Sequence, residues 1–314
     1  MDFNKLKGFL ETHDKYVILT HRNPDGDTVG TGFALWNILN DMGKLAVVKN
    51  CEPFPARYDF LYEGYTEREF EPETVIAVDI ADERLYGESL MGYAGKADLC
   101  IDHHISNRGY AKLSYVDGSA SSATLILYRF VKACGIKISD ITAKCIYTGL
   151  ATDTGCFKFE NTTPEAHIAA AELMAYSIDY ANVNRKMFDI KSRGRMKVEA
   201  AVTAGMEHLF DGRCTIICVT KALIKETGAD PSEFDGLASI PLESEEAIIG
   251  ITMKELDKGG FKLSVRTTDK ADASAFCRQF GGGGHIRAAG CEIPGSYDEV
   301  HGKIIAAVGE MFGE

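Results

Sequence analysis

YVILTHRNPDGD, residues 16–27, joins an apolar run to a polar loop that carries one histidine and two aspartates. Aliphatic and aromatic residues such as those of Tyr16–Thr20 are typical of a buried strand. The apolar pattern of Thr28–Met42 then predicts a helix that Gly43 closes. A strand that leads through a short loop into a helix is the unit of a mostly parallel sheet flanked by helices, so this stretch predicts an α/β fold.

Acidic or imidazole side chains follow an apolar run at three further places in the first half of the chain. These are Asp79 after Thr74–Val78, Asp102-His103-His104 after Asp98–Ile101, and Asp153 after Tyr147–Ala151. The carboxyl ends of parallel strands meet at one edge of a sheet, where ligands of open α/β folds bind. Four such clusters would form an anionic pocket, which divalent metal, in the simplest case two ions, would stabilise. Residues 141–151 also show a helical pattern, which would place Asp153 after a helix instead.

The triplet at residues 102–104 allows a division of roles. Side chains alternate along a strand, so Asp102 and His104 would share one face and His103 would take the other. One histidine could then bind metal while the other meets substrate, and the aspartate could orient a ring. Mixed imidazole and carboxylate ligands suit manganese, with magnesium and cobalt as alternatives. By contrast, we interpret Gly30-Thr31-Gly32 as small residues that let a helix approach the sheet closely, not as a nucleotide-binding motif.

The composition limits the classes of function. With 314 residues, 45% hydrophobic and 25% charged, the chain has the composition of a globular protein of about two domains. A net charge of −12 argues against binding duplex DNA, because such proteins are usually basic. No apolar stretch approaches the roughly 20 residues of a membrane span, and no signal peptide is visible. The nine cysteines include no C-x-x-C pair, which favours reduced thiols in a cytoplasmic protein.

A change in composition predicts the domain boundary. Residues 184–197 are basic and contain glycine, and we predict that they link a catalytic domain at 1–183 to a smaller α/β domain at 198–314. The second domain has strand patterns at Cys214–Thr220, Ala247–Lys254 and Phe261–Thr267, and helical patterns at Met196–Phe210, Ala271–Phe280 and Tyr297–Phe312. We expect a cleft between the two domains.

The second domain contains one distinctive run, Gly281-Gly282-Gly283-Gly284-His285. It lacks the Gly-Lys-Ser/Thr ending of a Walker A loop. Successive glycines lose much conformational entropy on folding, so we expect them where backbone N–H groups must approach phosphate oxygens. Positive charge for the same ligand would come from His285, Arg266, Arg278 and Arg287.

Together these motifs resemble those of the DHH phosphoesterase superfamily. Asp102-His103-His104 is the triplet that names it, and His21-x-Asn23-x-Asp25-x-Asp27, Asp79 and Asp153 are similar to its other N-terminal motifs, in order. The glycine run with Arg287-Ala288-Ala289-Gly290 resembles the signature of the DHHA1 domain that follows. The resemblance covers nearly the whole chain. It is greatest for the bifunctional oligoribonuclease (nanoRNase) and pAp phosphatase type, where pAp is 3′-phosphoadenosine 5′-phosphate.

The resemblance implies a site with two divalent ions, most often Mn²⁺, with Mg²⁺ or Co²⁺ as alternatives. One ion would be held by His21 and Asp25, the other by Asp27, His103 and Asp153, and Asp79 would bridge them. His104 would contact the scissile phosphate, and Asp102 would support the histidines. The DHHA1 domain would hold the rest of the nucleotide through Gly282, Gly283, Gly284, His285 and Arg266, with Arg278 and Arg287 close by.

The implied activity is hydrolysis of short single-stranded RNA and of pAp by metal-activated water. Cleavage of linear or cyclic di-adenylates is the alternative within the superfamily, and a non-catalytic nucleotide-binding regulator is a weaker one. The glycine run argues against an inorganic pyrophosphatase, and a RecJ-like exonuclease would normally carry an added nucleic-acid-binding module. We expect neither duplex DNA nor a membrane as partner. A homodimer, the preferred substrate and the direction of attack stay open.

Overall fold

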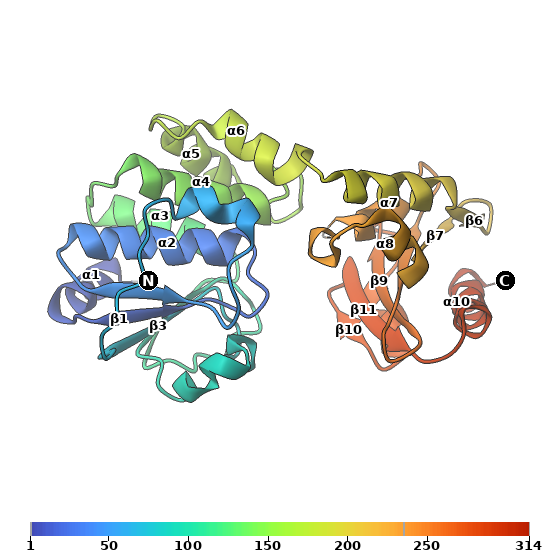
Figure 1. Ribbon diagram of the computed structural model, residues 1–314, viewed down its shortest axis with the longest axis horizontal. Helices are drawn as coiled ribbons and strands as arrows, with labels where there is room; N and C mark the ends of the chain where they lie inside the picture. The colour runs from blue at the N-terminus through green and yellow to red at the C-terminus, as the bar shows by residue number, and fades with distance from the viewer. Residues whose placement is uncertain (1, 235, 314) are drawn as a thin grey trace. The chain divides into compact units, whose positions relative to one another are not determined.

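The computed structural model describes residues 2–234 and 236–313 and divides into two compact units, Met1–Ile190 and Lys191–Glu314 (Figure 1). The division falls within the stretch 184–197 that the sequence predicts as a linker. Part of that stretch is helical: α6 (Tyr180–Asn184) and a π-helical turn, η4 (Arg185–Asp189), precede the division, and α7 (Arg193–Ala204) follows it.

The first unit is built on a five-stranded sheet in the order β2-β1-β3-β4-β5, in which every neighbouring pair is parallel. The strands are β1 (Tyr16–Leu19), β2 (Ala46–Lys49), β3 (Thr74–Val78), β4 (Leu99–Asp102) and β5 (Leu113–Val116). All residues of β1 and β3 are buried, as expected for strands that are covered on both faces. The predicted α/β fold with a mostly parallel sheet is therefore confirmed.

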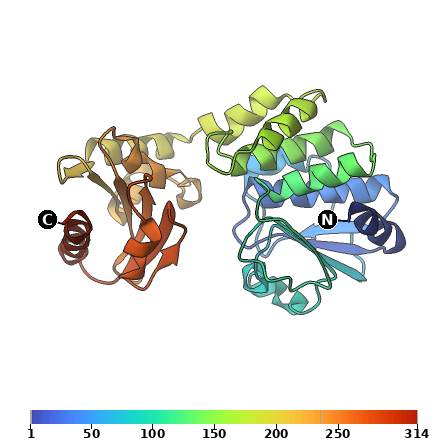
Figure 2. The ribbon, with the colours of Figure 1, turned by 180° about the vertical axis from the view of Figure 1, so that it is seen from behind.

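The two faces of this sheet are covered differently. One face, which includes Ile18 and Ile76, packs against the long helices. These are α1 (Phe3–Thr12), α2 (Gly26–Asp41), α3 (Ala123–Ala133) and α4 (Asp140–Asp153), with α5 (Pro164–Leu173) beyond them. The other face, which includes Val17 and Val75, packs against the short 3₁₀ helices η2 (Glu83–Tyr86) and η3 (Glu88–Tyr93) (Figure 2). Gly87, with a φ of 82°, separates η2 from η3, so no long helix forms here. A further 3₁₀ helix, η1 (Ala56–Leu61), follows β2.

Glycines let α2 and α4 pack closely together. A Cβ atom at Gly30 would lie 2.5 Å from the carbonyl oxygen of Cys145 on α4, and one at Gly149 would lie 2.9 Å from Oδ1 of Asp27. Gly32 faces the strands, since its Cβ would lie 3.2 Å from the side chain of Val48. The expected close helix–sheet contact thus belongs to Gly32, whereas Gly30 serves a contact between two helices. This contact brings the ends of α2 and α4 that carry Asp27 and Asp153 together.

The second unit contains a six-stranded sheet in the order β10-β11-β9-β8-β7-β6, in which only the β7–β8 pair is parallel among the described strands. Its strands are β6 (Glu207–Leu209), β7 (Cys214–Val219), β8 (Ile249–Glu255), β9 (Phe261–Thr267), β10 (Gly283–Gly284) and β11 (Ala288–Ile293). The helix predicted at Met196–Phe210 is α7, which ends at Ala204 because residues 207–209 pair with β7.

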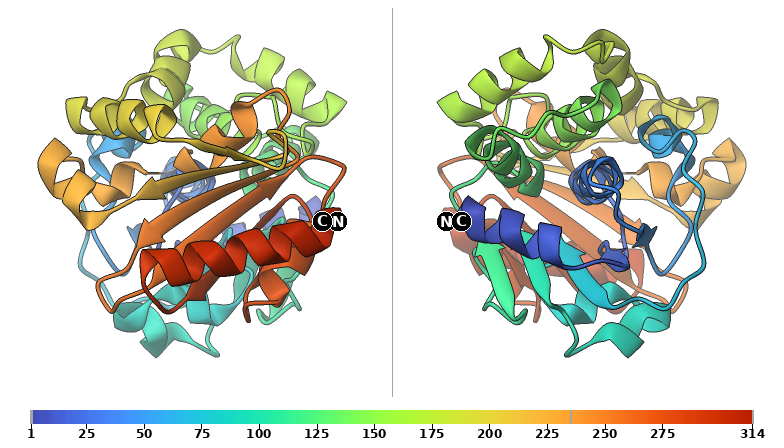
Figure 3. Two further views of the ribbon diagram at one scale, coloured as in Figure 1. Left: turned by 90° about the vertical axis from the view of Figure 1, so that its right-hand side faces the viewer. Right: turned by 90° about the vertical axis from the view of Figure 1, so that its left-hand side faces the viewer.

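Helices cover both faces of this second sheet. One core contains residues of α9 (Ala273–Arg278) and α10 (Tyr297–Phe312), and Figure 3 shows α10 lying along that face. A second, smaller core contains residues of α7 and of the 3₁₀ helix η6 (Leu237–Glu243), and α8 (Lys221–Thr227) packs against it. The short 3₁₀ helix η5 (Pro231–Glu233) lies between α8 and η6 in the chain. No helix in the described residues is long and apolar enough to cross a bilayer. All nine cysteines are free.

Candidate metal centre

The predicted ligands meet at one edge of the first sheet. His21 and Asp25 lie in the loop after β1, Asp27 in the first turn of α2, Asp79 directly after β3, and His103 after β4. Asp153 is the last residue of α4, so it is positioned by a helix and not by a strand. The structure therefore brings all six predicted ligands together, and it decides between the two placements of Asp153 that the sequence allows.

The potential ligand atoms form three overlapping groups around Asp79. His21, Asp25 and Asp79 make the first, Asp27, His103 and Asp153 the second, and Asp79, His103 and His104 the third, and the ligand atoms in each lie within 4.8 Å of one another. Oδ2 of Asp79 lies 3.5 Å from Nε2 of His21, whereas Oδ1 lies 3.5 Å from Nε2 of His103. The two oxygens of one carboxylate thus face different groups.

The surroundings of Asp79 disfavour an ionised carboxylate. Its side chain is 2% exposed, and its Oδ1 has no hydrogen-bond partner in the described part of the chain. Leaving such a group unsatisfied costs about 1–3 kcal/mol. Burial, and then the charges of the neighbouring aspartates, raise the pKa of Asp79 well above its usual range. Its φ of 57° lies in the left-handed region, which aspartate tolerates better than most residues.

Asp27 is held by the amino end of α3. Its carboxylate accepts the backbone N–H of Ala123 (2.6 Å) and both the N–H (3.0 Å) and the hydroxyl (2.8 Å) of Thr124. Burial nevertheless raises the pKa of Asp27. Burial, with the charges of Asp27 and Asp25, raises the pKa of Asp153 to about 9. The site concentrates more negative charge than its hydrogen bonds stabilise.

The spacing of these atoms fits bound cations. Nε2 of His21 lies 3.6 Å from Asp25, and Nε2 of His103 lies 3.8 Å from Asp27 and 3.7 Å from Asp153. These separations exceed the roughly 2.7–3.2 Å of N–H···O hydrogen bonds. Ligands bound to an ion at about 2.1 Å are separated by roughly 3–4 Å, which matches them. The unsatisfied Oδ1 of Asp79 and the imidazole–carboxylate donor set also fit divalent metal.

Asp102 and His104 form a hydrogen-bonded pair, and Nδ1 of His104 also lies 3.6 Å from Oδ1 of Asp79. Oδ1 of Asp102 lies 2.7 Å from Nδ1 of His104, and the Asp102 side chain is fully buried. This bond raises the pKa of His104. Because β4 ends at Asp102, strand alternation does not orient the two histidines. The Asp102 carboxylate orients His104 instead, while Nδ1 of His103 lies 3.3 Å from the carbonyl oxygen of Ala120.

Three asparagines that the sequence did not single out hold the ligand loops. Asn50 donates to the backbone carbonyl of His21 (2.7 Å), Asn107 to Asp102 (2.7 Å), and Asn161 to the carboxylate (3.3 Å) and backbone carbonyl (3.1 Å) of Asp153. A neutral amide orients a carboxylate without cancelling its charge. The sequence offers little signal for them, since asparagine is ordinary in turns.

The glycine run of the second unit has a structural explanation at three of its four positions. Gly281 has a φ of 73°. A Cβ atom at Gly282 would lie 2.3 Å from the carbonyl oxygen of Gly290, and one at Gly284 would lie 2.6 Å from that of Ala288. Only Gly283 has open space and an unstrained φ among these four. The amides of Gly282 and His285 donate to carbonyls of Cys277 and Ala288, so these two are not free for phosphate.

The predicted cations of the second unit differ in what they contact. Arg287 donates to the backbone carbonyls of Thr268 and Ala271, which gives it a structural role. Arg278 lies near Ser274 and Asp272. Arg266, on β9, is half-buried and donates to the Val265 carbonyl, and burial lowers its pKa. Arg266 has no acidic partner in the described residues, while His285 is exposed in the turn before β11.

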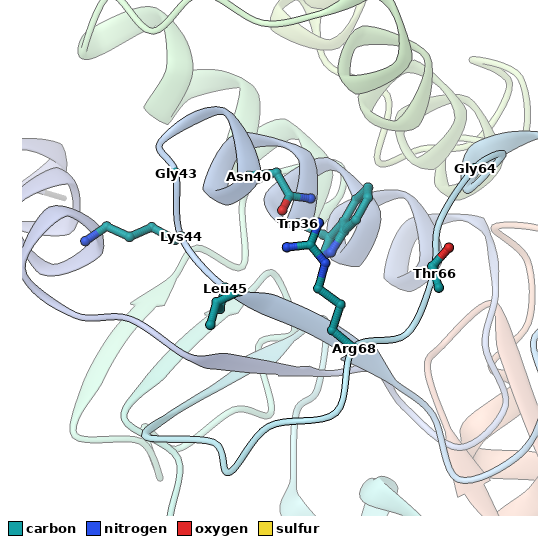
Figure 4. Close-up of a pocket in the computed structure, with 8 residues that line it drawn as sticks. All are labelled: Trp36, Asn40, Gly43, Lys44, Leu45, Gly64, Thr66 and Arg68. Carbon is teal, nitrogen blue, oxygen red and sulfur yellow. The ribbon is translucent and has the colours of Figure 1, made fainter.

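A surface cavity of ≈ 400 Å³ lies away from this centre, at the amino end of β2 (Figure 4). Its lining includes Trp36, Lys44 and Arg68. The indole N–H of Trp36 donates to the Ala46 carbonyl, and the ammonium of Lys44 to the Glu11 carbonyl. No predicted site residue lines it.

Comparison with known proteins agrees with the site. The DHH family N-terminal domain matches residues 15–150, and the DHHA1 domain matches residues 216–314. A Thermus thermophilus protein named bifunctional oligoribonuclease and PAP phosphatase NrnA is 30% identical over 300 residues, covering 93% of this chain and 89% of its own. The chain belongs to the DHH phosphoesterase superfamily.

Two further proteins are similar over nearly the whole chain. A Streptococcus mutans protein named probable bifunctional oligoribonuclease and PAP phosphatase is 26% identical, covering 92% of both chains. The crystal structure of an exopolyphosphatase-related protein from Bacteroides fragilis has a TM-score of 0.87 at 23% identity, covering 98% of this chain and 95% of its own. That likeness concerns the fold. The DHH triplet of this chain is Asp102-His103-His104, which lies at the metal centre.

Proposed function

We propose that this protein is a metal-dependent hydrolase that cleaves short oligoribonucleotides and pAp. The observation that carries the proposal is a pair of these ligand groups, one with His21 and one with His103, whose imidazoles face the two oxygens of the buried Asp79 carboxylate. The names of the Thermus and Streptococcus relatives support the substrate class, because those relatives span almost the same length as this chain.

The two groups suggest how the ions would be held. His21 and Asp25 would hold one, Asp27, His103 and Asp153 the other, and Asp79 would bridge them. Mixed imidazole and carboxylate ligands favour Mn²⁺, with Mg²⁺ or Co²⁺ as alternatives. When bound, two such ions polarise phosphoryl oxygens and lower the pKa of a water.

The chain's own residues supply orientation. Asp102 binds one ring nitrogen of His104, which leaves the other nitrogen on the exposed side of the ring, where a phosphoryl oxygen would meet it. We assign Asp102 to the support of His104 and not to metal, because its carboxylate belongs to neither ligand group. A donor already in place when charge develops costs no reorganisation.

In the second unit we propose that Arg266 and His285 bind the nucleotide. Arg266 lacks an acidic partner in the described residues and pairs with Ala288, whose backbone N–H donates to the carbonyl of His285. A Cβ atom at Gly283 would meet open space. Gly282 and Gly284 would contribute by giving the turn its shape. Arg278 would contribute charge only, and Arg287 would hold the turn.

A hydrolysis assay tests the proposal. A 5′-labelled RNA ladder of two to twenty-four nucleotides, pAp, and linear and cyclic di-adenylates are compared with Mn²⁺, with Mg²⁺ and with chelator. We expect hydrolysis only with metal, fastest on pAp and the shortest RNAs. Full activity in chelator contradicts the two-metal site. A clear preference for di-adenylates, or for the longest RNAs, contradicts the proposed substrate class.

A further inference from the structure

Asn107 lies three residues after His104 and donates a hydrogen bond to the buried Asp102 carboxylate. Its side-chain nitrogen donates to Oδ2 of Asp102 at 2.7 Å, while Oδ1 of the same carboxylate lies 2.7 Å from Nδ1 of His104. The two oxygens of Asp102 are therefore used by two different side chains. No other described side chain donates to Oδ2.

The orientation of the Asn107 amide is fixed by its other contacts. Its nitrogen also faces the carbonyl oxygen of Ile80 at 3.2 Å, and its oxygen accepts the backbone N–H of Gly109 at 2.8 Å. Turning the amide over would place its oxygen against two acceptors and its nitrogen against a donor. Ile80 directly follows Asp79, so Asn107 also connects the segment that carries the proposed bridging ligand to the end of β4.

Oδ1 of Asp102 also accepts the backbone N–H groups of His103 (2.8 Å) and His104 (3.3 Å). A carboxylate that is held at one oxygen only is nevertheless freer to rotate about its Cβ–Cγ bond, which has a broad torsional profile, than one held at both. Such rotation would weaken the bond to His104 and change the direction of the ring. A neutral amide at the second oxygen prevents the rotation and leaves the charge of Asp102 undiminished for His104. A lysine or arginine there would compete with the imidazole for that charge.

We propose that Asn107 is a positioning residue: it fixes the Asp102 carboxylate and, through it, the His104 ring that meets the reacting phosphate. The inference rests on the proposed function for the reaction that His104 serves. It adds a second residue behind His104, after Asp102.

The test compares Asn107→Leu with a matched control, Tyr110→Phe. The Tyr110 hydroxyl donates to the same Ile80 carbonyl, at 2.9 Å, but does not contact Asp102. With Mn²⁺ and pAp, we expect Asn107→Leu to lower kcat about 10–100-fold, the usual size of effects from residues behind a site, with KM changed less than about threefold. Tyr110→Phe should lower kcat less than about threefold, and bound Mn²⁺ should be unchanged in both. Asn107→Ala provides a second deletion variant should the leucine prevent folding.

A double-mutant cycle separates positioning from a general structural effect. If Asn107 acts through His104, Asn107→Leu should cost less than about threefold in kcat once His104→Ala is already present. An equal loss in both backgrounds, or an equal loss in Tyr110→Phe, overturns the proposal.

A measurement without turnover keeps the inference separate from the proposed function. In ¹⁵N-histidine-labelled protein with diamagnetic Mg²⁺, the Nδ1–H resonance of His104 is identified by its absence in His104→Ala. We expect it to shift or broaden in Asn107→Leu and to persist in Tyr110→Phe. An unchanged resonance in Asn107→Leu overturns the inference even if hydrolysis is observed, whereas a wild-type protein without hydrolysis contradicts only the proposed function.

Discussion

Asp27 and Asp79 of the candidate metal centre are buried beside other aspartates, while Asp153 is partly buried and Asp25 is exposed. Asp79 and Asp153 have raised pKa values for this reason. The ligands could be predicted from the sequence because histidines and aspartates directly after apolar runs are conspicuous. Asn50, Asn107 and Asn161 could not, because their role depends on neighbours far away in the chain, such as Ile80 for Asn107.

The raised pKa of Asp153, about 9 against an ordinary 3.8, predicts how stability depends on pH. Between these values the folded protein holds a proton that the unfolded chain releases, so the free energy of unfolding must fall as pH rises. In chelator we expect the Tm to fall from pH 5 to pH 9 by roughly 2–4 °C or more, the shift that corresponds to about 1 kcal/mol in a domain of this size. Saturating Mg²⁺ should reduce this fall, and so should Asp153→Asn. A Tm in chelator that rises over this range would contradict the burial of these carboxyls.

Asp79→Asn should have opposite effects on stability and activity. Asparagine keeps the shape and tolerates the left-handed backbone, but it removes a buried carboxyl whose ionised form the site disfavours. We therefore expect a higher Tm in chelator, together with loss of bound Mn²⁺ and at least about a tenfold loss of kcat/KM. Asp41→Asn, at the exposed end of α2, serves as the control and should change neither. Full metal content in Asp79→Asn would contradict a bridging role.

At the scale of elements, the centre depends on where α2, α3 and α4 meet. The amino end of α3 donates to Asp27, and Gly149 on α4 leaves space for that carboxylate. The sequence predicted α2, β1, β3 and α10 well, because their apolar residues form clear runs bounded by polar or turn residues. It missed α1, β5, α8 and β11, and it could not show that Gly283–Gly284 forms a short strand, since that pairing depends on the partner β11.

Two glycine-to-alanine substitutions should have opposite signs. A methyl group at Gly149 would lie 2.4 Å from the side chain of Thr124, so Gly149→Ala should destabilise by about 1–3 kcal/mol and lower metal content by displacing Asp27. Gly302, within α10, has nothing within 4 Å of its added Cβ, so Gly302→Ala should stabilise by about 0.5–1 kcal/mol. Thermal unfolding and metal analysis of both variants check this. If Gly149→Ala stabilised the protein as much as Gly302→Ala, the close packing around Gly149 would be contradicted.

At the scale of the whole molecule, each unit has its own sheet and its own core, which suits a division between chemistry and binding. The length of the chain predicted about two domains, and a change in composition predicted the boundary between them. The exact position of the boundary could not be predicted, because the basic stretch 184–197 is helical both before and after Ile190, where the two units divide.

Arg266→Ala should separate the roles of the two units. A group that binds ground state and transition state alike changes KM more than kcat. We expect a KM for a dinucleotide at least about tenfold higher, with hydrolysis of p-nitrophenyl phosphate nearly unchanged, because that molecule is small. Some loss of kcat on the dinucleotide would reflect poorer alignment. Lys262→Ala, exposed on the same strand, is the control. Equal loss on both substrates would place Arg266 in the chemistry itself.

The left-handed backbone of Asp79 also limits how this sequence can evolve. By its φ of 57°, the position accepts glycine, asparagine and aspartate most readily. By its proposed chemistry, it accepts aspartate or glutamate. Aspartate alone belongs to both sets, so we expect replacement by glutamate, its nearest chemical relative, not to be neutral. In a saturation library at codon 79, selection for folding should enrich glycine, asparagine and aspartate, and selection for activity should enrich aspartate alone, while at Asp25, whose φ is −105°, backbone geometry adds no such preference.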